Sequence, residues 1–352
     1  MVIFGWADSI HVRRWVRGMS EQGYQIRVIA LGGVPVPGAE CIILPRRGRW
    51  SYFRRAAEAV RLAREFRPDL VHVHYAGGFG LWSARCDFAP VLISVWGSDV
   101  VDLPHDLIHR FVIRRALRKS ARVSATSEYL RQVCVSLCPE VSERIDIIPF
   151  GVEIPANVAP MPALPVRLCF IKLHRSVYGP DVLLRALAIV CAKMPDVTLT
   201  MAGAGDMTPY LKRMVSDLGL EQNVEFPGLI PHEQIYALLQ EHHIMVMPSR
   251  EEAFGVAVLE AAACGRPTIA SRVGGVPEVL RDGETGLLVP PGDETALAEV
   301  ILRLVRDPET CRRMGEAGRS LVQEKYLWGH SLDRMTQLYE SMIHGQQAYP
   351  SV

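Results

Sequence analysis

The sequence predicts an α/β protein made of two doubly wound domains that face each other across a cleft. Strand-like apolar runs alternate with amphipathic helical stretches, which is the pattern of a mostly parallel sheet. The alternation stops near residue 150, in a segment rich in proline, and then resumes. A length of 352 residues suits two domains of ordinary size.

The first series of elements opens with a short N-terminal strand that runs into a loop. Short buried apolar runs predict the strands that follow, namely Gln25–Leu31, Leu70–His74, Val91–Val95, Val123–Ala125 and Ile145–Ile148. Apolar residues at helical spacing predict the helices between them, at His11–Glu21, Tyr52–Phe66 and Leu107–Lys119. The N-terminal domain is therefore expected at residues 1–151.

A linker is expected at residues 152–165, because this segment contains prolines at positions 155, 160, 162 and 165 and shows no periodicity. A second α/β series follows at residues 166–330. Its expected strands are Leu168–Ile171, Val197–Ala202, Val224–Phe226, Ile244–Met247 and Pro267–Ala270. Its expected helices are Asp181–Lys193, Thr208–Leu218, Glu233–Glu241, Gly255–Cys264 and Glu294–Arg306.

The last segment, residues 331–352, contains a helical stretch at Ser331–Ile343 with no strand after it. We expect this helix to cross back to the first domain. In doubly wound sheets, ligands bind at the carboxyl ends of the strands. Residues in the loops that follow the strands are therefore the candidates for function.

Charge is divided unevenly along the chain, with a net +7 over residues 1–150 and −6 over residues 151–352. A basic half points to a polyanion or an anionic membrane, although two ordinary solvated surfaces would give the same count. Eight cysteines without CxxC spacing favour reduced thiols. The sequence shows no apolar stretch near the ~20 residues of a membrane span and no signal-peptide pattern at its start, so a cytoplasmic location is expected.

The segment 248–291 contains the clearest candidates for ligand-binding residues. A strand ends at Met247, and Gly255 opens a helix. Glu252 precedes that helix and Glu260 lies on it. The free N–H groups at a helix start bind anions, and carboxylates accept hydrogen bonds from hydroxyl groups. This arrangement predicts a binding site for a ligand that has a sugar, a phosphate and a ribose in line. The alternative is that the two glutamates are ordinary surface residues beside a capped helix.

The motif Glu252-Ala253-Phe254-Gly255 with Glu260 resembles the E-x-F-G-x4-E motif of the family 4 retaining glycosyltransferases. Further motifs occur in the family's order over nearly the whole chain. They are Ala7–His11, Val71–Tyr75, Trp96–Asp99, Ile148–Val152, Ala270–Glu278 and Asp282–Val289.

The resemblance implies the GT-B fold, with two Rossmann-like domains and a nucleotide-sugar donor bound by the second. It implies that Glu252 and the backbone of Ala253, Phe254 and Gly255 hold the transferred sugar, while Glu260 holds the ribose. Gly274 and Gly275 would let a loop pass close to the donor, or would simply form a tight turn before Pro277. The implied activity is that of a hexosyltransferase which retains the anomeric configuration.

The departing diphosphate needs a cation or a helix end to stabilise its charge. Many relatives place an Arg–Lys pair after the first strand of the second domain, whereas this chain has Leu173 and Tyr178 at those places. Lys172 is our first candidate for the diphosphate contact and Arg175 the second. The alternative is that either residue is simply an exposed cation on a loop. No Asp-x-Asp occurs in the sequence, so metal-independent binding of the donor is expected, with no cofactor.

In the first domain, Asp8, Ser9 and His11 follow the first strand and are candidates for binding the acceptor. His74 and Asp99 end later strands and are candidate catalytic groups, since a histidine near neutral pH can exchange protons and hydrogen bonds. A structural role for either is the alternative. Trp96 replaces a histidine that many relatives carry before the Gly-x-Asp element.

Arginines alternate with aromatic residues over positions 46–55, and further cations follow at 110, 114, 115, 118 and 119. This combination favours an anionic membrane surface, where a polyprenyl-diphosphate-linked acceptor would lie, over nucleic acid. A solvated helix face is the alternative.

The function expected from these residues is sugar transfer to a glycan or lipid-linked acceptor in cell-surface polysaccharide or lipopolysaccharide synthesis. A UDP-sugar is expected ahead of a GDP-sugar as the donor. A nucleotide-sugar epimerase or hydrolase on the same fold, and a binding module without activity, remain alternatives. The binding module remains an alternative because Leu173 and Tyr178 replace the Arg–Lys pair of many relatives.

Overall fold

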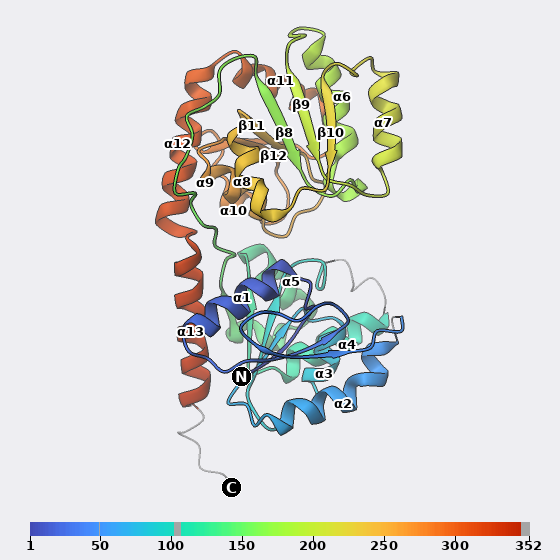
Figure 1. The fold of residues 1–352 in the computed structure, drawn as a ribbon, viewed down its shortest axis with the longest axis vertical. Coiled ribbons are helices and arrows are strands. Elements are labelled where there is room, and N and C mark those ends of the chain that lie inside the picture. Colours follow the sequence, from blue (N-terminus) through green and yellow to red (C-terminus); the bar gives the residue numbers. More distant parts are fainter. Residues whose placement is uncertain (49, 102–106, 346–352) are drawn as a thin grey trace. The chain divides into compact units, whose positions relative to one another are not determined.

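The computed structural model describes residues 1–48, 50–101 and 107–345. The chain divides into two compact units (Figure 1). Unit 1 comprises Met1–Pro149 together with the described part of Gly329–Val352, and unit 2 comprises Phe150–Trp328. Each unit contains its own parallel sheet.

The described part of unit 1 contains a seven-stranded parallel sheet in the order β3-β2-β1-β4-β5-β6-β7. The strand order reverses between β1 and β4, so the loops after these two strands lie at the topological switch point. The strands are β1 (Val2–Phe4), β2 (Arg27–Leu31), β3 (Glu40–Leu44), β4 (Val71–His74), β5 (Val91–Val95), β6 (Arg122–Ala125) and β7 (Ile145–Ile147).

Helices cover the two faces of this sheet (Figure 1). They are α1 (Ile10–Glu21), α2 (Ser51–Glu65), α3 (Gly78–Ser83), α4 (Leu107–Lys119) and α5 (Glu128–Leu137), followed by a 3-10 turn at Pro139–Arg144. Because both faces of the sheet are covered, every residue of β1, β4 and β5 is buried, including the polar residues His72, His74 and Ser94.

Unit 2 contains a six-stranded parallel sheet in the order β10-β9-β8-β11-β12-β13. Its switch point lies between β8 and β11. The strands are β8 (Arg167–Ile171), β9 (Thr198–Ala202), β10 (Val224–Gly228), β11 (Ile244–Met247), β12 (Thr268–Ser271) and β13 (Gly286–Val289).

The helices of unit 2 pack on both sides of this sheet (Figure 1). They are a 3-10 turn at Ser176–Tyr178, α6 (Pro180–Cys191), α7 (Thr208–Asp217), α8 (His232–Gln240), α9 (Val256–Ala263), α10 (Val276–Val279), α11 (Glu294–Val305) and α12 (Pro308–Lys325). One apolar core joins the inner faces of α6, α7 and α11 to the sheet.

The segment expected as a linker groups with unit 2, and Arg266 shows how it is held there. Arg266 is 3% exposed, and its guanidinium donates to the carbonyls of Ala159 and Pro160 at 3.2 and 3.1 Å. The same guanidinium also donates to the carbonyls of His242, Cys264 and Gln240. A buried guanidinium needs such partners, so this residue fastens the proline-rich segment to the second sheet.

The final helix, α13 (Trp328–His344), groups with unit 1 from Gly329 onward, as the sequence predicts for a helix that crosses back. Its Tyr339 is fully buried, and the hydroxyl lies 2.6 Å from Nδ1 of His72. Thr336 on the same helix donates a hydrogen bond to Gln22. In the described residues, no helix is both long enough and apolar enough to cross a bilayer.

Candidate functional site

The loop between β11 and α9 contains the Glu-Ala-Phe-Gly motif. Gly255 has a φ of 98°, in the left-handed region that residues with a side chain rarely adopt, and it turns the chain directly into α9. Phe254 is buried, and its ring centre lies 6.3 Å from those of Phe150 and Tyr326. The first N–H groups of α9 have no partner within the helix, so this end carries partial positive charge beside Glu252.

Lys172 and Glu252 form an ion pair between the loops that follow the neighbouring strands β8 and β11. The Lys172 Nζ donates to Oε2 of Glu252 at 2.5 Å, and their side chains are only 18% and 13% exposed. Nζ also lies 5.0 Å from the centre of the Tyr178 ring. Burial opposes the charge of Lys172, but the charge and hydrogen bond of Glu252 outweigh it and raise the pKa of Lys172. The structure thus brings three predicted site residues together.

Glu260 lies on α9 and is 9% exposed. Its Oε1 is 3.0 Å from Nε2 of His232, the first residue of α8. His232 did not emerge from the sequence, since no motif marks it and 28 residues separate it from Glu260. The pair holds the carboxylate in one orientation next to the motif loop.

The Gly274-Gly275 turn packs against the motif loop rather than standing apart from it. Gly275 donates its N–H to the carbonyl of Glu252 at 3.1 Å. A Cβ added at Gly275 would lie 2.3 Å from the carbonyl oxygen of Ala253, so a side chain cannot be accommodated there. Gly274 has a φ of 49°. Both glycines are therefore needed for the turn itself and for its close approach to the loop.

A second pair of glycines, which the sequence did not single out, follows β9. A Cβ at Gly203 would lie 2.0 Å from the carbonyl oxygen of Lys172, and one at Gly205 would lie 2.4 Å from that of His174. His174 is buried and its Nδ1 is 2.9 Å from the Thr208 hydroxyl. The loop after β8 is thus pressed against the loop after β9.

Arg250 holds the other side of the loop after β8. Its guanidinium donates to both carboxylate oxygens of Asp181 at 3.0 and 2.9 Å, and to the carbonyl of Ser176 at 2.6 Å. Asp181 and Arg250 were not among the predicted site residues. Arg175, the second candidate for the diphosphate contact, lies exposed on this loop. The loop is therefore held firmly while its cations remain at the surface or beside Glu252.

In unit 1, Asp8, Ser9 and His11 lie together after β1. Asp8 accepts a hydrogen bond from the N–H of Val34 at 3.1 Å and is exposed. Ser9 caps α1 by accepting from the N–H of Val12, and His11 is in the first turn of that helix. Ser9 thus has a structural role whatever else it binds.

His74 ends β4 and is fully buried, and neither of its ring nitrogens has a hydrogen-bond partner among the described residues. The centre of its ring lies 3.9 Å from that of His72 and 5.0 Å from that of Trp96, with the rings tilted against each other. Both ring nitrogens of His72 have hydrogen-bond partners, which are the hydroxyls of Tyr339 and Ser94. Burial lowers the pKa of His72 to about 3 and that of His74 well below its usual value, so both imidazoles are neutral at neutral pH.

Asp99 is fully buried, and backbone groups occupy both of its carboxylate oxygens. It accepts from the N–H of Ala76 at 2.8 Å, of Trp96 at 3.1 Å and of Gly97 at 3.0 Å. Burial raises the pKa of Asp99 against the lowering effect of these bonds. This geometry makes Asp99 a residue that positions the loops after β4 and β5, the first of which begins directly after His74.

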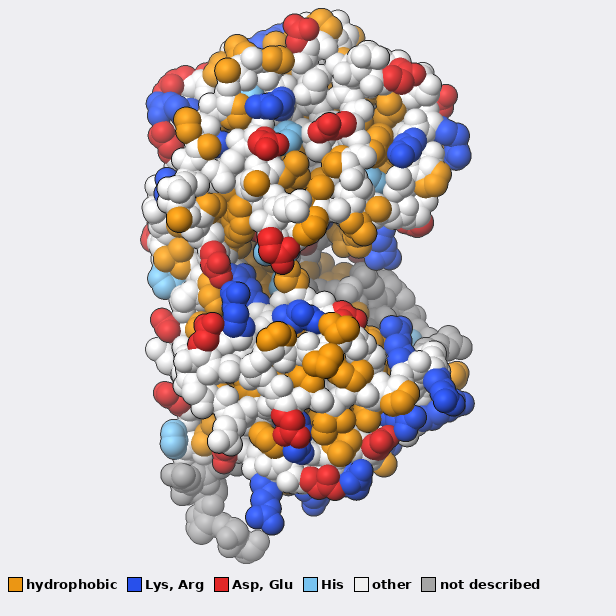
Figure 2. Space-filling view, viewed as in Figure 1, with side chains coloured by type: hydrophobic (Ala, Val, Ile, Leu, Met, Phe, Trp, Pro, Cys, Tyr) orange, Lys and Arg blue, Asp and Glu red, His pale blue; other side chains and the backbone are white. Residues whose placement is uncertain are grey.

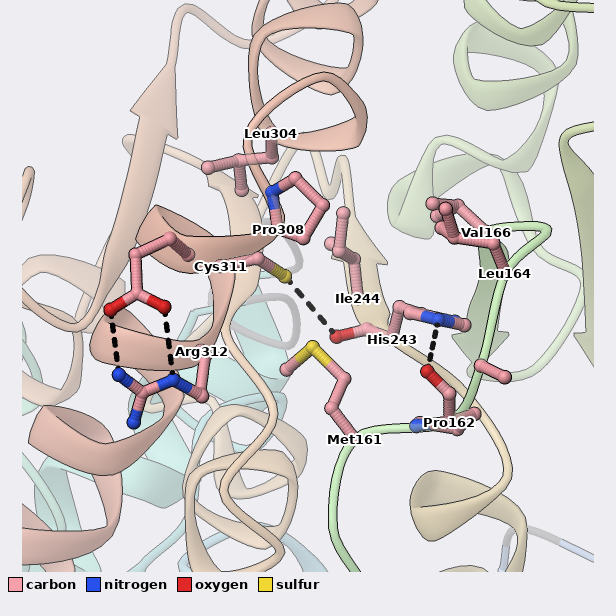
Figure 3. Close-up of a pocket in the computed structure, with 12 residues that line it drawn as sticks. Met161, Pro162, Leu164, Val166, His243, Ile244, Leu304, Pro308, Cys311 and Arg312 are labelled. Atoms are coloured by element: carbon pink, nitrogen blue, oxygen red, sulfur yellow. Dashed lines mark hydrogen bonds and ion pairs between the residues drawn. The ribbon is translucent and has the colours of Figure 1, made fainter.

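A cavity elsewhere in unit 2 lies at the opposite edge of the sheet from the motif loop. Figure 3 shows this cavity, of about 320 Å³, with Met161, Leu164 and Leu304 in its wall. Val166 precedes β8 and Ile244 begins β11, so the cavity lies at the amino ends of these strands. Lys172 and Glu252 follow the carboxyl ends of the same two strands, where ligands of doubly wound sheets bind.

Two family models match the chain. Residues 165–321 match "Glycosyl transferases group 1", and residues 2–127 match "Glycosyl transferase 4-like". Together the two matches cover most of the sequence.

Among characterised relatives, the GDP-mannose-dependent alpha-(1-6)-phosphatidylinositol monomannoside mannosyltransferase of Mycolicibacterium smegmatis is 35% identical over 52% of this chain and 50% of its own length. The chain thus spans about half the length of that relative. The N-acetyl-alpha-D-glucosaminyl L-malate synthase of Bacillus anthracis is 28% identical over 77% of this chain and 74% of its own.

Solved structures agree in fold. Sucrose-phosphate synthase from Thermosynechococcus elongatus superposes with a TM-score of 0.82 at 23% identity, over 98% of this chain and 99% of that one. Anabaena HepE, solved in complex with UDP and glucose, gives a TM-score of 0.79 at 19% identity, over 97% and 99%. The chain therefore belongs to the family 4 glycosyltransferases and has their GT-B fold of two Rossmann-like α/β domains.

Proposed function

We propose that the protein transfers a sugar, with retention of configuration, from a nucleotide-sugar donor bound by unit 2 to an acceptor hydroxyl bound by unit 1. The observation that carries this proposal is the largely shielded Lys172–Glu252 ion pair beside the start of α9. The product would be a glycan or a lipid-linked saccharide of the cell surface, such as polysaccharide or lipopolysaccharide.

In this proposal the ion pair opens when the donor binds. The ammonium group of Lys172 and the first N–H groups of α9 take the diphosphate oxygens, whose negative charge grows as the bond to the sugar breaks. Glu252 then accepts hydrogen bonds from the hydroxyls of the sugar. Until that exchange, each partner satisfies the other, which explains how two charged groups remain so little exposed.

Glu260 accepts hydrogen bonds from the two ribose hydroxyls, and His232 keeps its carboxylate oriented. The close approach of the Gly274-Gly275 turn keeps side chains away from the motif loop, where the donor would lie. Arg175 is available on the surface as a second cation for the diphosphate. On the acceptor side, the unpartnered nitrogens of His74 would bind an acceptor or sugar hydroxyl, with Asp8 and His11 following the neighbouring strand β1.

A thermal-shift panel of UDP- and GDP-sugars tests this proposal, because a ligand that binds only the native state raises its melting temperature. We expect at least one nucleotide sugar to raise the melting temperature, with a UDP-sugar first and a GDP-sugar next. We also expect turnover of that donor only when an acceptor is present, with the anomeric configuration of the product, read by NMR, matching the donor. Turnover without acceptor would indicate a hydrolase, and saturable binding without turnover would indicate a binding module.

An anionic membrane surface is part of the proposal. On α4, Leu107 and Phe111 are 81% and 67% exposed, and arginines at positions 110, 114 and 118 alternate with them. Lys and Arg side chains gather along the edge of unit 1 where α2 and α4 lie (Figure 2). Apolar side chains with cations around them are typical of a helix that lies in a membrane interface.

The double variant Arg110→Glu with Phe111→Ser should therefore lose most of its sedimentation with anionic vesicles. The matched double variant Arg213→Glu with Tyr210→Ser, on the exposed side of α7 in unit 2, should sediment as the parent does. Equal loss in both variants, or no loss in the first, would remove α4 from the membrane surface.

A further inference from the structure

A cavity of about 320 Å³ opens in unit 1 where the chain leaves β1 and β4. Its wall combines the rings of Trp6, Tyr52, Phe53 and Tyr75 with the side chains of Ile108 and Val112 from α4. No motif discussed above assigns a ligand to it. Its volume is at the lower end of the range found for small-molecule sites.

The rings of this cavity are fixed by packing rather than loosely placed. Trp6 meets Tyr52 edge to face with ring centres 5.9 Å apart, and both rings pack on Phe79 in the core. Gly78 allows this arrangement, because a Cβ there would lie 2.3 Å from the Tyr52 ring. The cavity therefore exists before a ligand arrives, which lowers the entropic cost of binding.

The chemistry of the wall selects an apolar group rather than a sugar. Among the described residues that line the cavity there is no Asp, Glu, Asn or Gln. The polar side-chain groups in the wall are the ring nitrogens of two tryptophans and a histidine and the hydroxyls of two tyrosines, at Trp6, Trp50, His109, Tyr52 and Tyr75. A pyranose has several hydroxyls that would each need a partner when buried, because a buried hydroxyl without one is costly. A hydrocarbon chain has no such requirement and fits the largely aromatic and aliphatic wall.

The cavity also adjoins the predicted acceptor residues. Trp6 lies two positions before Asp8, and Tyr75 directly follows His74. Tyr75 has a φ of 88°, a conformation that residues other than glycine rarely adopt. Backbone strain of this kind is found preferentially at functional sites.

Cations lie next to residues that form the cavity, although none of them lines it. The guanidinium of Arg46 lies 4.7 Å from the centre of the Trp6 ring. The helix that contributes Ile108 and Val112 to the wall presents Arg110, Arg114 and Arg118 with exposed Leu107 and Phe111 next to them. Positive charge beside an apolar cavity is complementary to a hydrocarbon chain that ends in a phosphate.

We propose that this cavity binds the first part of the hydrocarbon chain of a lipid-phosphate acceptor, with Arg46 beside its phosphate. The proposal rests on the proposed function, because it names the class of acceptor that the same enzyme uses. It places the apolar chain on Trp6, Tyr52 and α4, and leaves the hydroxyl to be glycosylated near His74.

The test measures binding of n-alkyl phosphates of increasing chain length, kept below their micelle-forming concentrations, by tryptophan fluorescence of the full chain. Affinity should rise about fourfold for each added methylene until the cavity is filled, since burying one is worth about 0.8 kcal/mol. Val112→Trp, which fills the cavity, should abolish this dependence on length. Val133→Trp on α5 is the matched control, half-buried on a helix outside the cavity, and should keep it.

Phe53→Ser provides a second variant on a side chain that is 43% exposed, and it should weaken binding of the longer phosphates even if Val112→Trp fails to fold. Affinity independent of chain length in the parent, or unchanged in the folded variants, would overturn the proposal. Binding of glucose oligosaccharides in place of the alkyl phosphates would overturn it in favour of a glycan acceptor.

The same preparations are tested with the donor panel, so that the two proposals can fail separately. Donor binding without dependence on chain length leaves the proposed function standing and removes the lipid site. Chain-length dependence without any donor binding leaves the apolar site standing and removes the proposed function.

Discussion

Replacing Lys172 with methionine is expected to lower kcat/KM for sugar transfer by about 10²–10³-fold, the usual effect of losing one group that stabilises developing negative charge. Methionine keeps the length of the side chain and its packing against Tyr178 but removes the cation. The loss should appear mainly in kcat, because the charge on the departing diphosphate is largest in the transition state.

The control must separate lost catalysis from lost stability, since the variant leaves Glu252 little exposed and without its cation. The double variant Lys172→Met with Glu252→Gln removes both charges and should recover stability without recovering activity. Lys193→Met, at an exposed lysine of the same unit, should change neither. A folded Lys172→Met enzyme with parental kcat/KM would transfer the proposed role to Arg175 or to α9 alone.

Replacing Glu260 with alanine is expected to weaken donor binding by about 10- to 100-fold, because hydrogen bonds to a charged group contribute about 1.5–3 kcal/mol. The carboxylate is nearly buried and held by His232, so it is already oriented to receive the ribose hydroxyls. Calorimetric titration with the nucleotide sugar that the thermal-shift panel identifies gives the dissociation constant.

Two comparisons make this result specific. Glu299→Ala removes an exposed glutamate from α11 and should leave donor affinity unchanged. A free ribose 5-phosphate or nucleoside competitor should lose affinity in Glu260→Ala, whereas a sugar 1-phosphate, which lacks the ribose, should not. Undiminished donor affinity in a folded Glu260→Ala protein would rule out the ribose contact.

The regular alternation of apolar runs was enough to predict two parallel α/β units, but some elements left too weak a signal. Helix α12 was not predicted, since Gly315 and Gly318 interrupt its helical pattern. The structure explains them, because a Cβ at Gly315 would lie 2.0 Å from the carbonyl oxygen of Gly265 and one at Gly318 would press on Ala262. These glycines allow α12 to pack closely on α9, and that contact cannot be read from local propensity.

The candidate site was predictable only in part, for a related reason. Lys172 and Glu252 were each chosen from the loop that they occupy, yet their ion pair joins residues 80 positions apart and depends on β8 and β11 being neighbours. His232 and Arg250 carry no motif, so only the folded chain shows that they orient Glu260 and the loop after β8. For Asp99 the difference runs the other way. Its position after β5 predicted a catalytic role, whereas in the structure its carboxylate oxygens accept hydrogen bonds from backbone N–H groups.

The close approach of Gly203 and Gly205 to the loop after β8 limits how the choice of donor can be changed by mutation. Saturation libraries at these two positions would yield mostly misfolded variants, because a first carbon at either one collides with a carbonyl oxygen of the neighbouring loop. Leu173 and Arg175 are better positions for such libraries. Their side chains are exposed on the loop after β8 and can vary without moving its backbone.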